Sequence, residues 1–344
     1  MNSRPRLGNK NGNGAAFRAS LLAWYDSCAR DLPWRKSHDP YRIWLSEIML
    51  QQTRVAAVIS RYEEFLRRFP TVEKLAAARE SSVLAAWSGL GYYRRARMLH
   101  AAAKLVAGEL HGEFPRSGDR LKQLPGIGRY TAAAVASIAF GEPVAVVDGN
   151  VERVLCRFFA GDLSEEKIWQ AAATLLDRSR PGDFNQAMME LGATVCTPRS
   201  PACLTCPVME LCATRGERPA GQKPARQKKR EIHFALAHRN GSIFLTRRPH
   251  DARLMASMWE LPEISASPIR APNPRSASNH SVKAKSRVPL FTLRHSITVT
   301  DYTVRVWHAA SPDAAGEWVP LRRLPKLALT GLARKILRRA EILT

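Results

Sequence analysis

Two periodicities divide the chain. From residue 17 to about residue 191, Ala, Leu and Val recur three and four residues apart, which is typical of helices with one apolar face. The clearest helical stretches are residues 39–69, 72–88, 92–108 and 129–140, and Gly and Pro interrupt them. Beyond residue 231, the segments 232–238, 242–247 and 298–307 are short and rich in β-branched and aromatic residues, which predicts strands. A helix over 330–340 closes the pattern.

These patterns predict an all-α region followed by a smaller α+β domain. We expect a disordered polar tail over residues 1–16, the all-α region over 17–213, a linker over 214–231 and the α+β domain over 232–344. The linker has Lys, Arg and Pro without apolar periodicity, and the Ser/Pro-rich stretch 265–285 predicts a loop.

Charge narrows the class of partner. The 344 residues include 53 Lys and Arg against 30 Asp and Glu, a net charge of +23, and this excess favours a polyanionic partner. Nucleic acid is the first interpretation and an anionic membrane surface the second. No run of 18 apolar residues is present and residues 1–16 carry no apolar signal segment, so we expect a cytoplasmic, nucleoid-associated protein that does not enter a membrane.

Four of the six cysteines lie close together in the order C-x6-C-x2-C-x5-C. Four thiolates at this spacing can surround one metal centre, either zinc or a [4Fe–4S] cluster, and the spacing alone does not choose between them. The predicted ligands are Cys196, Cys203, Cys206 and Cys212.

A glycine-rich turn, residues 124–128 (LPGIG), separates two helical stretches. Gly126 and Gly128 allow a tight turn and let a phosphate approach the backbone N–H groups at the start of the helix that Arg129 opens. This pattern predicts a helix-hairpin-helix element that binds the nucleic-acid backbone. The alternative is an ordinary turn between two helices with a glycine C-cap.

Two carboxylates stand out by their surroundings. Asp148 precedes a helix that carries Arg153 and Arg157, whose charges can stabilise a buried carboxylate, although a simple N-cap is the alternative. Glu47 lies in the apolar helical stretch 43–50, where desolvation would raise its pKa, and the alternative is a surface glutamate.

The hairpin, the aspartate and the cysteine pattern, in that order, resemble the endonuclease III superfamily of DNA glycosylases. Residues 44–53 (WLSEIMLQQT) and 89–93 (GLGYY) resemble its MutY-type adenine DNA glycosylases, and the resemblance runs from about residue 24 to residue 212. It implies a [4Fe–4S] cluster rather than zinc. It also implies removal of adenine mispaired with 8-oxoguanine or guanine in double-stranded DNA, and we expect the protein to act as a monomer.

The resemblance also implies roles for single residues. Glu47 would protonate the adenine and help to activate water, Asp148 would stabilise the oxocarbenium ion, and Asn150 and Tyr130 would support them. The superfamily's glycosylase/lyases carry a Schiff-base lysine at position 130, and a tyrosine cannot form an imine, so we expect a monofunctional glycosylase.

Gln52 and Tyr92 match residues that insert into the base stack beside the lesion. Without the resemblance, a helix-surface or core residue is the favoured interpretation of each.

The C-terminal half resembles the adenine DNA glycosylases less closely than the N-terminal half does. Residues 244–248 (FLTRR) and 258–262 (MWELP) resemble the Nudix-like module with which these enzymes recognise 8-oxoguanine. Only Glu263 follows where a hydrolytic Nudix site needs several glutamates, so we do not expect hydrolysis there. Alignment on Arg294 and His295 puts residues 297–299 (ITV) at the lesion-probing triplet. Thr298 keeps its hydroxyl, whereas the aromatic residue and the histidine are missing.

Two alternatives remain. One is an endonuclease III-like glycosylase/lyase acting on oxidised pyrimidines, and the identity of Tyr130 together with the second domain argues against it. The other is a non-catalytic DNA-binding iron–sulfur protein, and the presence of both Glu47 and Asp148 argues against that.

Overall fold

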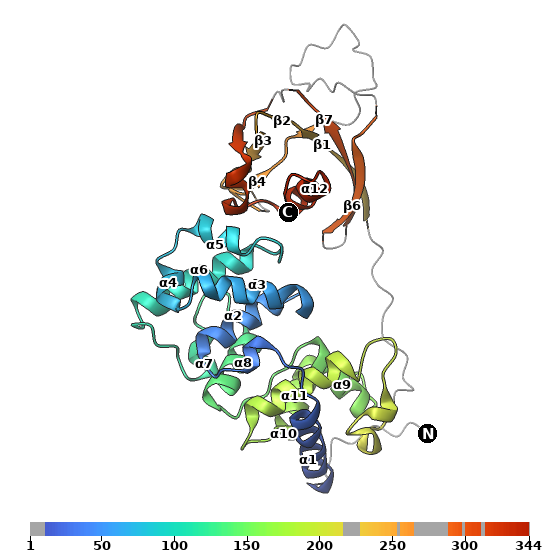
Figure 1. Ribbon diagram of the computed structural model, residues 1–344. Coiled ribbons are helices and arrows are strands. Elements are labelled where there is room, and N and C mark those ends of the chain that lie inside the picture. The colour runs from blue at the N-terminus through green and yellow to red at the C-terminus, as the bar shows by residue number, and fades with distance from the viewer. Residues whose placement is uncertain are drawn as a thin grey trace. The chain divides into compact units, whose positions relative to one another are not determined.

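A computed structural model describes residues 11–215, 228–252, 255–264, 288–297, 300–310 and 314–343 (Figure 1). Internal contacts divide the chain into two units. The first comprises Met1–Ala77 and Met98–Gln222, and the second comprises Ala78–Arg97 and Lys223–Thr344. Within the described ranges, no helix combines the length and the apolar character needed to cross a bilayer.

The first unit is helical, as the sequence predicts. Its helices, which include the α6 helix that begins in the second unit, are α1 (Asn11–Cys28), α2 (Pro40–Leu50), α3 (Val55–Arg68), α4 (Val72–Ala76), α6 (Arg94–Gly108), α7 (Gly118–Leu121), α8 (Arg129–Phe140), α9 (Gly149–Phe158), α10 (Glu165–Leu175) and α11 (Pro181–Thr194). Among the described residues of this unit, three 3₁₀ turns complete it: η1 (Pro33–Arg35), η2 (Cys203–Thr205) and η3 (Met209–Leu211).

Several helix boundaries differ from the predicted stretches. Residues 39–69 form α2 and α3 rather than one helix, because the chain turns between them with Gln52 at φ 55°. Residues 72–88 likewise form α4 and α5 (Glu80–Ala86), and α6 begins at Arg94 because Tyr92 has φ 46°. Helix α1 begins at Asn11 rather than at residue 17, since it extends back from the buried Phe17.

Packing in the first unit brings four helices together around the later site. Helix α2 packs against α8, and α11 packs against both α8 and α9. The core between α1, α9 and α11 is built from apolar side chains such as Phe17, Leu155 and Phe184, which are almost completely buried. The polar residues discussed below therefore project from helices that are fixed by a packed core.

In its described residues, the second unit contains α5 and two small sheets. One sheet has the order β5 (Glu263–Ile264), β1 (Lys228–Leu236), β7 (Thr300–His308), β6 (Phe291–Ile297). The other has the order β2 (His238–Arg239), β3 (Ser242–Arg247), β4 (Trp259–Glu260), with β8 (Glu317–Pro320) paired to β3. The 3₁₀ helix η4 (Leu321–Lys326) leads to α12 (Gly331–Arg339), whose Leu332, Ile336 and Leu337 join strand residues in one core.

Strand β1 begins inside the predicted linker, at Lys228. Its parallel register runs from Lys228 opposite Thr300 to Leu236 opposite His308. Backbone pairing with β7 therefore extends the strand through residues whose charge predicts a linker. The predicted loop over 265–285 lies outside the described residues, as does Thr298.

Candidate active site and cysteine cavity

Glu47 is the most deeply buried carboxylate among the candidate residues, at 6% exposure. Helix α2 is buried on nearly every side around it, so the carboxyl has little contact with water. Tyr130 on α8 donates a hydrogen bond of 2.6 Å from its hydroxyl to Glu47 Oε2. Burial raises the pKa of Glu47 to about 7, the Tyr130 hydrogen bond lowers it in part, and the negative charge of Asp148 raises it further. Glu47 is therefore poised to hold and release a proton near neutral pH.

Asp148 is the N-cap of α9, so the capping interpretation of this residue is correct in geometry. Its Oδ1 accepts hydrogen bonds from the backbone N–H groups of Asn150 and Val151, at 2.9 and 2.8 Å. Its Oδ2 accepts a bond of 3.0 Å from the Asn150 side chain. These three donors and the helix N-terminus stabilise its negative charge and fix its orientation. A capping role does not compete with a catalytic one, because the carboxylate is both held and only partly buried.

Tyr130 lies within the electrostatic influence of both carboxylates. Burial raises its pKa well above its ordinary value, and the charges of Glu47 and Asp148 raise it further. The phenol is consequently a permanent donor at neutral pH. The structure thus brings together four of the residues that the sequence singled out: Glu47, Tyr130, Asp148 and Asn150.

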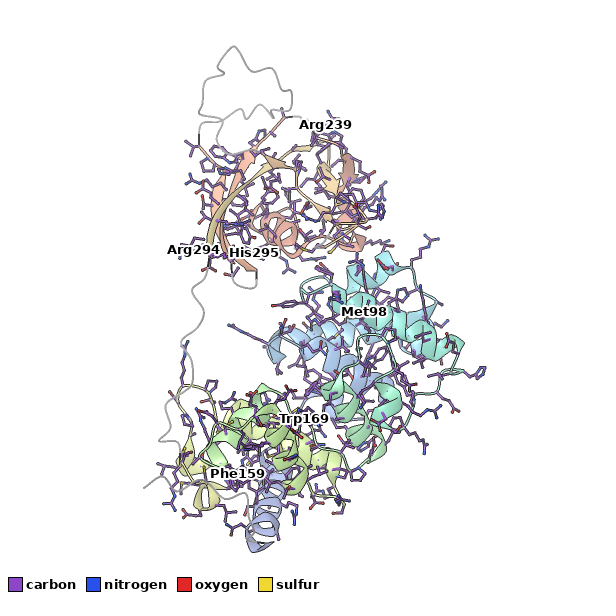
Figure 2. The ribbon with its side chains drawn as sticks, turned by 180° about the vertical axis from the view of Figure 1, so that it is seen from behind. Met98, Phe159, Trp169, Arg239, Arg294 and His295 are labelled. Atoms are coloured by element: carbon purple, nitrogen blue, oxygen red, sulfur yellow. The ribbon has the colours of Figure 1, made fainter. Side chains whose placement is uncertain are left out.

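The hairpin turn between α7 and α8 has the geometry that its glycines suggest. Gly126 has φ 75°, and a Cβ added to it would lie 2.5 Å from the Cβ of Met98, which Figure 2 labels. Gly128 is the N-cap of α8 and makes no side-chain capping bond, so the first N–H groups of the helix lack a side-chain cap. Arg129 follows, and its guanidinium lies 3.8 Å over the ring of Trp169 on α10.

Gln52 and Tyr92 are both exposed, which excludes a core role for either. Gln52 lies in the first unit, next to Gln51, which donates a hydrogen bond of 3.2 Å to the Thr131 hydroxyl. Tyr92 lies in the second unit and is 45% exposed. Each has a positive φ, a conformation that side chains other than glycine adopt rarely.

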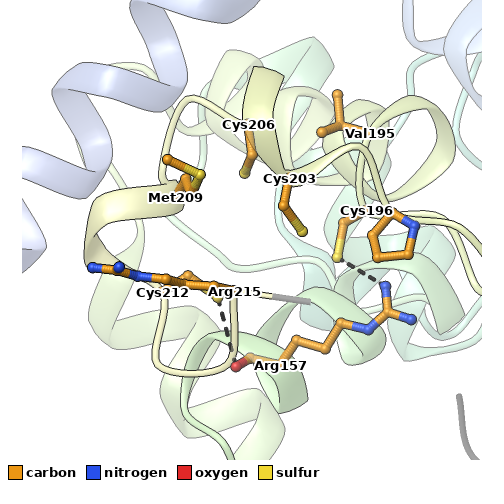
Figure 3. Close-up of a pocket in the computed structure, with 9 residues that line it drawn as sticks. Arg157, Val195, Cys196, Cys203, Cys206, Met209, Cys212 and Arg215 are labelled. Carbon is orange, nitrogen blue, oxygen red and sulfur yellow. Dashed lines mark hydrogen bonds between the residues drawn. The ribbon is translucent and has the colours of Figure 1, made fainter. Parts of the chain in front are cut away.

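The four cysteines that follow α11 line one cavity (Figure 3). Arg157, Val195, Pro201, Met209 and Arg215 complete its wall. Among the described residues, no group of three Cys, His, Asp or Glu side chains is arranged so that it could hold a single metal ion. Burial raises the pKa of the Cys206 thiol to about 11, and the charges of the neighbouring thiolates raise it too. Such a set of sulfur donors suits a multi-iron group that neutralises the thiolates.

Arg157 contacts this cavity rather than the aspartate, contrary to the expectation that it stabilises a carboxylate. Its Nη1 donates to Cys196 Sγ at 3.3 Å, and its two terminal nitrogens donate to the Thr197 and Pro198 carbonyls at 2.7 and 2.9 Å. The physical reason is geometric, since the turn at 197–198 offers it a fork of acceptors. Arg153 does approach Asp148, but through Asn150, whose Oδ1 it contacts at 2.8 Å.

Three regions of the chain match families of known proteins. Residues 45–177 match the HhH-GPD superfamily of base excision DNA repair proteins, residues 196–212 the iron–sulfur binding domain of endonuclease III, and residues 232–339 the NUDIX domain. The adenine DNA glycosylase of Buchnera aphidicola subsp. Baizongia pistaciae is 35% identical over 243 residues, which cover 67% of this chain and 69% of that protein. The chain belongs to the adenine DNA glycosylase family.

Other members of the adenine DNA glycosylase family are more similar over a smaller part of their length. The human adenine DNA glycosylase is 52% identical over 215 residues, 58% of this chain and 39% of that protein. The first curated relatives, from human, rat and mouse, are matched over only 39–48% of their own length.

A solved thermostable thymine-DNA glycosylase resembles this member of the family in structure. It is 32% identical, with a TM-score of 0.57 over 60% of this chain and 99% of that one. Endonuclease III bound to DNA shares the fold, with a TM-score of 0.54 and 24% identity over 61% of this chain and 99% of that one. The predicted fold class, a helix-hairpin-helix region with a cysteine loop and a Nudix-like domain, is confirmed.

Sequence reasoning missed side chains that brace this candidate site. Asn185 on α11 is buried, accepts a hydrogen bond from the Val146 backbone at 3.0 Å and donates one to the Val144 carbonyl at 2.9 Å. It thereby fixes the segment that leads into Asp148. Glu190 is paired with Arg30 and Arg35, and although burial acts in the opposite direction, their hydrogen bonds lower its pKa to about 2. An Asn and a Glu on the apolar face of a helix are the signals that could have identified both.

Proposed function

We propose that this protein is a monofunctional adenine DNA glycosylase of base excision repair. It hydrolyses the N-glycosidic bond of adenine mispaired with 8-oxoguanine or guanine and leaves an abasic site. The observation that carries this proposal is the pair of carboxylates in different environments. Glu47 has a pKa of about 7, whereas Asp148 accepts three hydrogen bonds from N–H donors.

Each carboxylate suits one side of the bond that breaks. Departure of adenine leaves negative charge on the base and positive charge on the sugar, so the base needs an acid and the sugar needs an anion. Protonated Glu47 supplies the proton to the flipped adenine. Asp148, held in place by the N-terminus of α9, faces the oxocarbenium ion as a fixed negative charge.

The proton that Glu47 gives to the adenine is replaced by a proton from water. Glu47 becomes a carboxylate when the base leaves, and it can then accept a proton from the water whose oxygen bonds to the sugar C1′. The Tyr130 hydroxyl, 2.6 Å from Glu47 Oε2, orients this carboxyl through both steps. Because Tyr130 has no amine, it cannot form a Schiff base with the sugar. The DNA strand therefore stays intact at the abasic site until alkali is added.

Contacts with DNA are assigned to three groups. The turn of Gly126 and Gly128, with Arg129 at the start of α8, binds backbone phosphate. Gln52 and Tyr92 are exposed and insert beside the mispair. The Nudix-like domain, including Thr298, reads the base opposite adenine.

The cysteine cavity holds a [4Fe–4S] cluster through Cys196, Cys203, Cys206 and Cys212. When bound, such a group would have a structural role, because all four thiolates of the loop after α11 would be fixed to it. Arg157 supports that loop from α9 through bonds to Thr197 and Pro198, independently of the cluster. The glycosylase region over residues 17–213, a linker from residue 214 to the start of β1 at Lys228, and the recognition domain from there to residue 344 complete the proposed organisation. We propose that the protein acts as an intracellular monomer.

A panel of duplexes tests the function. Single-turnover cleavage is measured on adenine opposite 8-oxoguanine, guanine or thymine, and on thymine opposite guanine, with and without added alkali. We expect strand breaks only after alkali, fastest for adenine opposite 8-oxoguanine. Breaks without alkali would indicate a lyase. Thymine release would instead favour the activity named for the structural relative.

A further inference from the structure

The loop that presents Tyr92 is held in an unfavourable backbone conformation. Gly89, Gly91 and Tyr92 have φ values of 101°, 69° and 46°. The value at Tyr92 carries a steric cost that glycine does not have. A loop of this kind keeps its conformation only if surrounding contacts hold it.

Part of this support comes from the loop's own flanks. Trp87 Nε1 donates to the Gly91 carbonyl at 3.1 Å, and Arg95 donates to the Leu90 carbonyl at 3.1 Å. The Arg95 guanidinium lies 5.4 Å from the centre of the Tyr92 ring and 5.5 Å from that of Trp87. The Tyr92 ring is therefore backed by a cation while much of its surface stays open to solvent.

The other part comes from residues more than two hundred positions later in the same unit. The Tyr93 hydroxyl donates to the Leu329 carbonyl at 3.0 Å, and the Ser88 hydroxyl donates to the same carbonyl at 3.3 Å. Arg334 Nε on α12 donates to Ser88 Oγ at 2.8 Å. The two residues that bracket the loop are thus tied to the start of the last helix. Beyond the loop, Arg97 donates to the Ala256 carbonyl at 2.5 Å.

The hydrogen bond between Arg334 and Ser88 is buried. Ser88 is 1% exposed and Arg334 is 9% exposed. Placing a guanidinium in such a position is costly unless its hydrogen bonds are made, and an apolar side chain of similar volume would be cheaper. An arginine here fixes the geometry of Ser88, because its planar group must lie in one orientation to donate.

We propose that Arg334 is a positioning residue for Tyr92: through Ser88 and the Leu329 carbonyl, the C-terminal helix holds the loop in the conformation that presents Tyr92 to DNA. This inference rests on the proposed role of Tyr92 beside the mispair. Without the anchor, the loop relaxes from its positive-φ conformation, and the fraction of protein ready to insert Tyr92 falls.

The test uses the 344-residue protein, four single variants and one double variant. The single variants are Arg334→Met, Ser88→Ala, Tyr92→Ala and the control Arg338→Met, and the double variant combines Arg334→Met with Tyr92→Ala. Arg338 lies on the same helix, is exposed and loses the same charge. Two quantities are measured: the single-turnover rate of adenine release, and the fluorescence of 2-aminopurine placed beside the mispair, which reports unstacking. Thermal unfolding of each variant checks the fold.

We expect Arg334→Met and Ser88→Ala each to lower the release rate about fivefold to tenfold and to weaken the unstacking signal, while Arg338→Met matches wild type. In the Tyr92→Ala background, Arg334→Met should cost less than about twofold more, because both act through one side chain. If Arg334→Met does not fold, Ser88→Ala decides the question. Full activity in Ser88→Ala, or losses that multiply in the double variant, would overturn the proposal.

Failure of the proposed function is distinguishable from failure of this inference. If wild type releases no adenine from any duplex, the function is wrong. The unstacking signal on binding would still compare Arg334→Met with Arg338→Met. Equal unstacking by these two variants would then reject the anchor.

Discussion

Replacing Glu47 with Gln should stabilise the folded protein at alkaline pH while removing activity. The carboxyl is buried, and its pKa rises from 4.5 in the unfolded chain to about 7 in the fold. A raised carboxyl pKa means that the folded state binds the proton more tightly. The contribution to stability is therefore fully present below pH 4.5 and is lost as the pH rises through 7. Glutamine, which never ionises, keeps the Tyr130 hydrogen bond without that loss.

The magnitude follows from the shift. A rise from 4.5 to about 7 corresponds to about 3 kcal/mol at full ionisation, at 1.36 kcal/mol for each pH unit. About 1 kcal/mol of the difference is already present at pH 5.5, so about 2 kcal/mol should develop between pH 5.5 and pH 8.5.

Denaturant unfolding of wild type and Glu47→Gln at several pH values in this range measures the difference directly. Glu63→Gln is the matched control, because Glu63 is an exposed glutamate on α3. The control should show no pH-dependent gain. If the stability difference between Glu47→Gln and wild type is the same at pH 5.5 and pH 8.5, or shifts in favour of wild type at pH 8.5, the claim that this carboxyl is buried in a low-dielectric site is refuted.

Three further predictions follow from the described contacts. Asp148→Asn should abolish adenine release, measured by single-turnover cleavage, yet leave the affinity for mismatched DNA within about threefold of wild type. If the variant loses both adenine release and mismatch binding, Asp148 has a folding role alone. Gly126→Ala should weaken DNA binding and lower stability, since its Cβ would meet Met98 at 2.5 Å, whereas Gly128→Ala meets no atom within 4 Å and should be far milder; equal effects on thermal unfolding would contradict this. Arg157→Gln should lower the iron content per protein, because the loop at 197–198 loses its fork of donors; unchanged iron would argue against that support.

The sequence predicted those parts of the fold that local chemistry decides. Helix α8 has the predicted bounds, 129–140, because Gly128 precedes it and Gly141 ends it in the left-handed conformation. Strand β3 likewise matches its β-branched and aromatic pattern over 242–247. The desolvation expected for Glu47 follows from its apolar neighbours alone.

Other features depend on contacts that no local pattern contains. The break after α2 comes with a tertiary bond from Gln51 to Thr131, which the local pattern of residues 39–69 does not contain, and that pattern predicts one helix. The sequence gives Arg153 and Arg157 the same expected role beside Asp148, because both lie on the helix that follows it. In the structure, however, Arg157 donates its hydrogen bonds to the turn at 197–198 instead. Asn185 reaches the segment before Asp148 across a sequence separation that spacing cannot reveal.

The pH dependence of adenine release tests the central claim most directly. Under single-turnover conditions, with adenine opposite 8-oxoguanine, the rate should be constant at low pH and fall about tenfold per pH unit well above pH 7, because Glu47 must be protonated to donate. The Glu47→Gln variant should be slow and nearly independent of pH. A wild-type rate that stays constant from pH 6 to pH 9 would contradict the assignment of Glu47 as the acid.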